Sequence, residues 1–275
     1  MNCSHVCFIF FYNFRSIMAN SEEYDFFKYL LYQETRSNHL YRHDQSISDE
    51  RRAGVIDWLI SLCCSFRSHN SVIHLSVQIL DRFLSSNIMM SQNLQVAGAA
   101  CFLIASKHDE VHSPKPADLL YSMGGTTSVK ELVDMESFVL QTIGFQLSIP
   151  TANIFLCNLV NLLSIDISNN SINLSSFYIE LSLLTTTSLQ FSSCLLAASA
   201  LVLSRILLKI PDPWPNHIAQ VTSLDLSTMQ ECILFLSSLV SAAKDYPYTK
   251  EVMDKYSYRK YNSISKLKQP DNLPR

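Results

Sequence analysis

One stretch of the chain is apolar on nearly every side of the helix that it predicts. Residues 97–105 read Ala-Gly-Ala-Ala-Cys-Phe-Leu-Ile-Ala and lie in the middle of a predicted helix over about 92–108. A helix that is apolar all round is buried in the centre of a domain, because none of its faces gains from contact with water. Its small residues also let neighbouring helices approach closely. The sequence therefore predicts a domain in which other helices surround this one.

Amphipathic helices are predicted on both sides of this central helix. Their apolar residues recur at the 3.6-residue period of a helix, and Ser128-Val129-Lys130-Glu131 forms a capping box at the start of the last one. A polar linker follows the first helix, from Ser37 to about Ser48. The predicted helices cover about 22–36, 50–67, 72–85, 113–121 and 128–143.

The pattern restarts after Pro150, with helices predicted near 151–164, 174–188, 190–208, 214–222 and 226–244. Residues 99–107 parallel residues 197–205, and Met135-Glu136 is echoed by Met229-Gln230. A repeat at roughly 95–100 residues suggests two copies of one five-helix domain. The predicted fold class is all-α, with two tandem five-helix domains preceded by an N-terminal helix.

The predicted domain limits follow from this repeat. The first domain covers 22–148 with its preceding helix, and the second covers 149–246. Residues 1–21 are interpreted as a disordered or artefactual extension and 247–275 as a polar tail. Within that tail, Lys255 to Tyr261 is basic with interleaved tyrosines, which we interpret as a surface segment that packs its tyrosines rather than a nucleic-acid contact.

The composition argues against several classes of protein. A net charge of −3 gives no basic excess for binding nucleic acid. The 8 cysteines include no Cys-x-x-Cys pair, so a zinc ribbon is unsupported and reduced thiols are expected. Arg205 and Lys209 interrupt the longest apolar run, which is shorter than the ~18–20 residues of a membrane span.

The chain also lacks the common motifs of catalysis. It contains no phosphate-binding loop, no Gly-x-Ser-x-Gly elbow and no His-Glu-x-x-His. His108 and His112 are four residues apart, but Ser113-Pro114 ends the helix directly after them, so we predict no metal site. Asp109-Glu110 is interpreted as a solvated helix end rather than an acid/base pair. We predict no cofactor and no enzyme.

Several motifs fall in an order and spacing that resemble the cyclin box of A/B-type cell-cycle cyclins, and the short N-terminal region resembles small plant J-type cyclins. The resemblance covers about 22–147 well and 150–265 more loosely. It implies a regulatory subunit that binds and activates a cyclin-dependent protein kinase in the nucleus and/or cytoplasm. The motifs are Arg51-Arg52-Ala53-Gly54-Val55-Ile56-Asp57-Trp58-Leu59, Leu80-Asp81-Arg82-Phe83-Leu84, Leu94-Gln95-Val96-Ala97-Gly98-Ala99-Ala100, Ile104-Ala105-Ser106-Lys107-His108-Asp109-Glu110 and Met135-Glu136.

The resemblance assigns roles to particular residues. Lys107 and Glu136 match the Lys and Glu with which cyclins grip the mobile αC helix of the kinase. The same resemblance places Phe145 and Leu147 in the apolar part of the kinase interface, and Asp109 and Glu110 in its acidic rim.

The resemblance also implies an internal ion pair between Arg52 and Asp81. Trp58, Leu94 and Gln95 match a hydrophobic docking patch for substrate and inhibitor peptides, but Val55 stands where the family has a Leu. Arg51, Gly54 and Ser61 replace a Met, an Ile and a Glu. We therefore expect a shallower, more basic groove and weak peptide binding.

Two other functions remain open at this point. A cyclin-fold scaffold would bind partners without activating a kinase, and the altered docking patch favours it. A DNA-binding module of the general transcription factor B type also pairs two five-helix domains, but the acidic balance and the missing zinc ribbon count against it.

Overall fold

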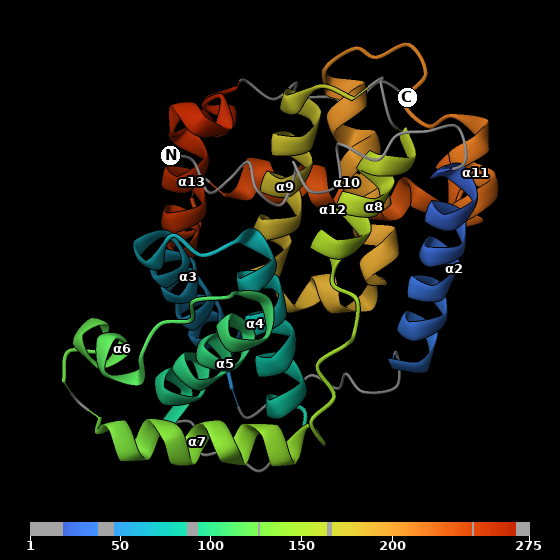
Figure 1. Cartoon of the computed structure of the whole chain (residues 1–275). Helices are drawn as coiled ribbons and strands as arrows, with labels where there is room; N and C mark the ends of the chain where they lie inside the picture. Colours follow the sequence, from blue (N-terminus) through green and yellow to red (C-terminus); the bar gives the residue numbers. More distant parts are fainter. Residues whose placement is uncertain are drawn as a thin grey trace.

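The computed structural model describes residues 19–37, 47–86, 93–125, 127–163, 167–243 and 245–267, and these residues form helices and no strands. The predicted extension at 1–21 therefore lies almost wholly outside the described residues. Figure 1 shows the arrangement of the helices. Their bounds are α2 (Ala19–Ser37), α3 (Asp49–Phe66), α4 (Asn70–Leu84), α5 (Leu94–Asp109), α6 (Pro116–Ser122), α7 (Val129–Thr142), α8 (Ala152–Leu163), α9 (Asn169–Leu183), α10 (Ser193–Leu207), α11 (Asn216–Thr222), α12 (Leu226–Ala242) and α13 (Lys250–Ser257), with short 3-10 turns at Thr186–Gln190, Pro247–Thr249, Arg259–Tyr261 and Ile264–Lys266.

Helix α5 is the centre of the first five-helix domain and packs against α3, α4 and α7 (Figure 1). Every residue from Ala97 to Ser106 is buried, as the apolar run predicts. Gly98 is needed for the contact with α3, because a Cβ atom there would lie 2.7 Å from Cγ1 of Val55. Close packing at this point fixes the position of α5, whose C-terminal end carries Lys107.

Helix α10 has the same place in the second domain, among α8, α9 and α12 (Figure 1). The prediction of an all-α fold with two tandem five-helix domains is confirmed among the described residues. The predicted helix at 174–188 has the wrong bounds, since α9 begins at Asn169 and ends at Leu183. Its start is set by Ser168, whose side chain accepts a hydrogen bond from the N–H of Ser171 at 3.2 Å.

The N-terminal helix α2 packs against α8 and α11 of the second domain. The domain limits predicted from the sequence had placed this helix in the first domain. The Phe27 ring meets that of Phe155 edge-on at 5.7 Å between centroids. Glu34 Oε1 accepts a hydrogen bond from the N–H of Cys194 at 3.1 Å, in the first turn of α10. Burial raises the pKa of this carboxyl. The helix therefore ties the start of the described chain to its second half.

The segment predicted as a polar surface tail instead contains α13, which packs against α3 and α9. Lys255 is 4% exposed, and its Nζ donates to both carboxylate oxygens of the fully buried Glu180 at 2.8 Å. The Tyr256 hydroxyl donates to Oε1 of Glu180 at 2.7 Å. The polar composition of this segment misled the prediction, because the partner of its cation lies 75 positions away.

Within the described residues, no single helix is long and apolar enough to cross a membrane. One strongly bent pair, Leu226–Ala242 with Pro247–Ser257, meets the criterion jointly, by length and composition alone.

Candidate partner-binding site

Lys107 and Glu136, which are 29 positions apart in the sequence, form an ion pair on the first domain. Lys107 lies in the last turn of α5 and Glu136 in the middle of α7, and Lys107 Nζ is 2.5 Å from Glu136 Oε1. The Lys107 side chain is 45% exposed and that of Glu136 is 11% exposed. An ammonium has three N–H donors and a carboxylate has two acceptor oxygens, so both groups keep hydrogen-bonding capacity for a partner.

Phe145 and Leu147 lie three and five residues after the C-terminal end of α7. Phe145 is 66% exposed and its φ is 56°, in the left-handed region that non-glycine residues rarely adopt. Leu147 is half-buried and packs against the core. The structure therefore presents one exposed aromatic ring on a sharply turned backbone, beside the helix that carries Glu136.

Arg82 of α4 holds this turn, and the sequence analysis gave it no role. Its Nη2 donates to the carbonyl of Ile143 at 3.0 Å, and its Nη1 donates to the carbonyl of Gln146. Arg82 is buried. The signal in the sequence is the pair Asp81-Arg82 inside an otherwise apolar helix end, because buried charges require partners.

The predicted acidic rim is only partly available to a partner. Glu110 Oε1 accepts from the backbone N–H of His69 at 3.0 Å, and Oε2 accepts from the Ser68 hydroxyl at 3.2 Å. Glu110 therefore stabilises the start of α4. Asp109 Oδ1 lies 2.6 Å from Nδ1 of His108, and both residues are on the exposed end of α5.

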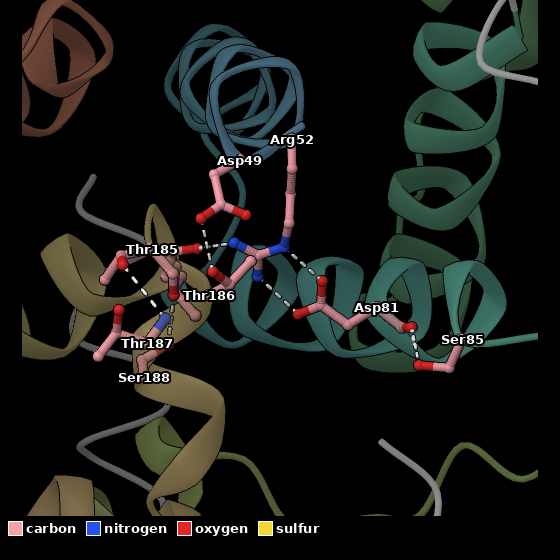
Figure 2. Close-up of polar contacts among 9 residues, drawn as sticks. Asp49, Arg52, Asp81, Ser85, Thr185, Thr186, Thr187 and Ser188 are labelled. Carbon is pink, nitrogen blue, oxygen red and sulfur yellow. Dashed lines mark hydrogen bonds and ion pairs between the residues drawn. The ribbon is translucent and has the colours of Figure 1, made fainter. Parts of the chain in front are cut away.

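The predicted ion pair of Arg52 and Asp81 is present and buried (Figure 2). Arg52 Nε and Nη2 donate to the two carboxylate oxygens of Asp81 at 2.6 and 2.7 Å. Its Nη1 donates to the carbonyl of Leu183 at the end of α9, at 2.9 Å. Close by, the Thr186 hydroxyl donates to Oδ2 of Asp49 at 2.8 Å. The pair thus joins α3 to α4 and also joins the two domains.

The four residues of the predicted docking patch lie on α3 and α5. Leu94 is only 3% exposed, Val55 and Trp58 are half-buried, and Gln95 is exposed. Since Val55 also packs against Gly98 on α5, little depth remains between the two helices at that point. The depth of the groove and its affinity for peptides stay predictions.

Within the described residues, no group of three or more His, Cys, Asp or Glu side chains is arranged so that it could hold a metal ion. The described cysteines form no disulfide with one another, whereas Cys3 and Cys7 lie outside the described residues. Burial raises the pKa of Cys63, Cys101 and Cys194 and keeps these thiols protonated.

Two family models together match almost the whole chain. Residues 24–148 match the cyclin N-terminal domain, and residues 150–270 match the cyclin C-terminal domain. The second match extends over α13, in agreement with the packing of that helix.

Curated relatives named as A-type cyclins come from plants and animals. Cyclin-A1-1 of Oryza sativa subsp. japonica is 30% identical over 236 residues, which cover 84% of this chain and 46% of the relative. The G2/mitotic-specific cyclin-A of Patella vulgata is 28% identical over 264 residues, covering 94% and 61%. Cyclin-A2 of Bos taurus is 31% identical over 229 residues, covering 82% and 52%. The chain thus spans about half the length of the curated relatives it matches.

Solved structures show the same fold. A viral cyclin from herpesvirus saimiri superimposes with a TM-score of 0.67 at 26% identity, over 77% of this chain and 96% of that one. A chain of the yeast RNA Pol II CTD kinase complex superimposes with a TM-score of 0.60 at 15% identity, over 87% and 85%, and shows the fold alone.

Proposed function

Because this chain belongs to the cyclin family, we propose that it is a regulatory subunit that binds and activates a cyclin-dependent protein kinase. The observation that carries the proposal is the contact between Lys107 and Glu136 on the exposed side of the first domain. The yeast relative in fold comes from a kinase complex, which supports a kinase as the class of partner. The chain itself would supply no catalytic group.

The geometry suits a helix end as the bound feature. A helix leaves its last carbonyls and its first N–H groups without partners inside the helix. Lys107 Nζ can donate to such carbonyls, and the Glu136 carboxylate can accept from such N–H groups, as charge-assisted hydrogen bonds. Phe145 adds an apolar contact beside them. A kinase αC helix held in this way can place its Glu against the Lys of the ATP site and complete the active site.

The test is co-purification of the full chain with purified cyclin-dependent kinases, followed by phosphorylation of a test substrate. We expect Lys107→Ala/Glu136→Ala to reduce both binding and activation by at least about tenfold, as loss of a charged contact at an interface does. Lys130→Ala/Asp134→Ala removes two exposed charges from the same helix α7 and serves as the matched control.

Each outcome of this test separates the alternatives. Kinase binding without activation would favour a scaffold. Equal behaviour of wild type and the Lys107/Glu136 variant, both folded, would show that the family match reports only the fold. Salt-dependent DNA binding in place of kinase binding would favour the transcription-factor module.

We further propose that substrate and inhibitor peptides dock weakly on the patch of Val55, Trp58, Leu94 and Gln95. Fluorescence anisotropy with a labelled docking peptide measures this affinity. Tight binding that Trp58→Ala abolishes would contradict the proposal. We place the protein in the nucleus and/or cytoplasm, and a tagged chain found in neither compartment would contradict that placement.

A further inference from the structure

The turn after α7 holds an exposed aromatic residue in an unfavourable backbone conformation. Gly144 and Phe145 have φ of 63° and 56°, so two consecutive residues are left-handed. Glycine adopts this conformation freely, but a phenylalanine does so at a cost in free energy. Phe145 is also largely exposed, so its ring gains little from burial within the chain. Burial among the described residues therefore does not account for an aromatic residue at this position.

Hydrogen bonds from two directions stabilise this turn. The N–H groups of Gly144 and Phe145 donate back to the carbonyls of Gln141 and Leu140, at 3.1 and 2.9 Å, and close the end of α7. The carbonyls of Ile143 and Gln146, on either side of the left-handed pair, accept from the two terminal nitrogens of Arg82. A planar guanidinium holds two such acceptors at a fixed separation, which a lysine ammonium does not.

The second domain carries different residues at the positions that correspond to Arg82 and Phe145. Helices α4 and α9 both contain 15 residues, and the thirteenth residue is Arg82 in α4 but Leu181 in α9. Helix α12, the counterpart of α7, has its C-cap at Ala243 as α7 has at Ile143, and the residue two positions after the cap is Asp245 rather than an aromatic. The aromatic residue and its arginine therefore occur together in the domain that carries Lys107 and Glu136, and neither stands at the corresponding position of the other domain.

We propose that Arg82 is a positioning residue that holds residues 143–147 so that Phe145 projects toward the kinase. Arg82 is buried and acts through Phe145 rather than by contact with the partner. That Phe145 faces a kinase rests on the proposed function. That Arg82 holds residues 143–147 in place concerns the free chain alone.

A double-mutant cycle tests the link between the two residues. We expect Phe145→Ala to weaken kinase binding about tenfold or more, as loss of an aromatic anchor does. Arg82→Lys should weaken it about tenfold in the wild-type background but less than about twofold when Phe145 is already Ala, since coupled residues are not additive. Ile79→Val, in the core of the same helix, controls for general destabilisation and should leave affinity unchanged. Equal effects of Arg82→Lys in both backgrounds would overturn the proposal.

Amide hydrogen exchange in the free protein supplies a readout that needs no kinase. Arg82→Lys should speed exchange at the Phe145 N–H at least about tenfold while the amides of α5 keep their protection. If Arg82→Lys does not fold, Arg82→Gln, which buries no charge, replaces it. Unchanged exchange at the Phe145 N–H would overturn the role of Arg82 but leave the proposed function untouched. A wild-type chain that binds no kinase would contradict both the proposed function and the affinity changes expected in the double-mutant cycle.

Discussion

The two halves of the molecule share their buried framework and differ at their surfaces. The seventh residue of α4 and of α9 is a serine, Ser76 or Ser175, whose hydroxyl donates to the carbonyl four residues earlier at 2.6 or 2.7 Å. The twelfth residue is a buried carboxylate, Asp81 or Glu180, and each pairs with one cation. The repeat seen in the sequence is therefore a repeat of internal hydrogen bonds as well as of helices.

The difference lies at the ends of the two central helices. Lys107 at the end of α5 is partly exposed beside Glu136, whereas its counterpart in α10, Arg205, is 2% exposed. Arg205 Nη2 donates to the carbonyl of Asp212 at 2.9 Å, inside the loop before α11. The position of Glu136 is taken by Gln230 on α12. The same fold thus presents an exposed charged site in one half and a buried, hydrogen-bonded arginine in the other, so the two halves share a fold without sharing the site.

The largest effect is expected from breaking either buried ion pair. Arg52→Met would leave Asp81 buried without its cation, and Lys255→Met would do the same to Glu180. Each should lower the free energy of unfolding by about 3–5 kcal/mol, measured by chemical denaturation. The exposed Lys250→Met is the control and should stay within about 0.5 kcal/mol. If only one of the two variants lost less than about 1 kcal/mol of unfolding free energy, the two domains would not depend equally on their buried ion pairs.

The contrast between Lys107 and Arg205 predicts opposite behaviour. Arg205→Met should cost about 1–3 kcal/mol of stability, because it leaves the Asp212 carbonyl without a donor, and should leave the kinase affinity of the folded protein unchanged. Lys107→Met should reduce kinase affinity but change stability by less than about 1 kcal/mol, since its pair is partly solvated. Thermal unfolding and a binding titration on both variants decide the matter. A kinase-binding defect in folded Arg205→Met would contradict the assignment of Arg205 to stability and of Lys107 to binding.

A variant of Gly98 tests how closely α3 must approach α5 in the first domain. At the corresponding position of the repeat, the second domain has the larger residue Leu196. Gly98→Ala should destabilise the protein by about 1–3 kcal/mol through overpacking against Val55. Val55→Ala should recover part of this loss in the double variant, as seen by thermal denaturation. If Gly98→Ala is as stable as wild type, the close approach of α3 to α5 does not require a glycine at this position.

The smallest effect is expected from Asp57, which caps the start of α13 by accepting from the N–H of Glu251 at 3.1 Å. Burial raises its pKa from 3.8 to about 6, against this hydrogen bond and Lys250, while Glu251 and Asp254 raise it further. A raised carboxyl pKa adds stability at low pH that is lost as the pH rises through about 6. Between pH 4 and 7 the wild type should lose about 1 kcal/mol relative to Asp57→Asn, a value reduced for partial solvation. Parallel pH profiles of the two proteins would refute this.

Apart from the bounds of α9 and the whole of α13, local pattern was enough to predict the helices and the burial of α5, because the period of the apolar residues shows which helix faces are buried. The roles assigned to Lys107 and Glu136 came from the resemblance to cyclins, but their contact with each other was not predicted, since a spacing of 29 residues carries no geometric signal by itself. The burial of Lys255 and the cap that Glu34 gives α10 were missed for the same physical reason. Their partners lie 75 and 160 positions away, where only the assembled tertiary structure brings them together.

The bridging position of α13 has a consequence for synthesis on the ribosome. Asp57 and Glu251 are 194 positions apart, so the face of α3 that α13 covers stays open until almost the whole described chain has been translated. Until then Glu180 lacks its ion-pair partner Lys255, and the face of α3 that α13 will cover stays exposed to water. Native contacts of such high sequence separation form late and slow folding. Completion of both halves therefore waits for the last helix to leave the exit tunnel, and a chain that stops short of it leaves neither half finished.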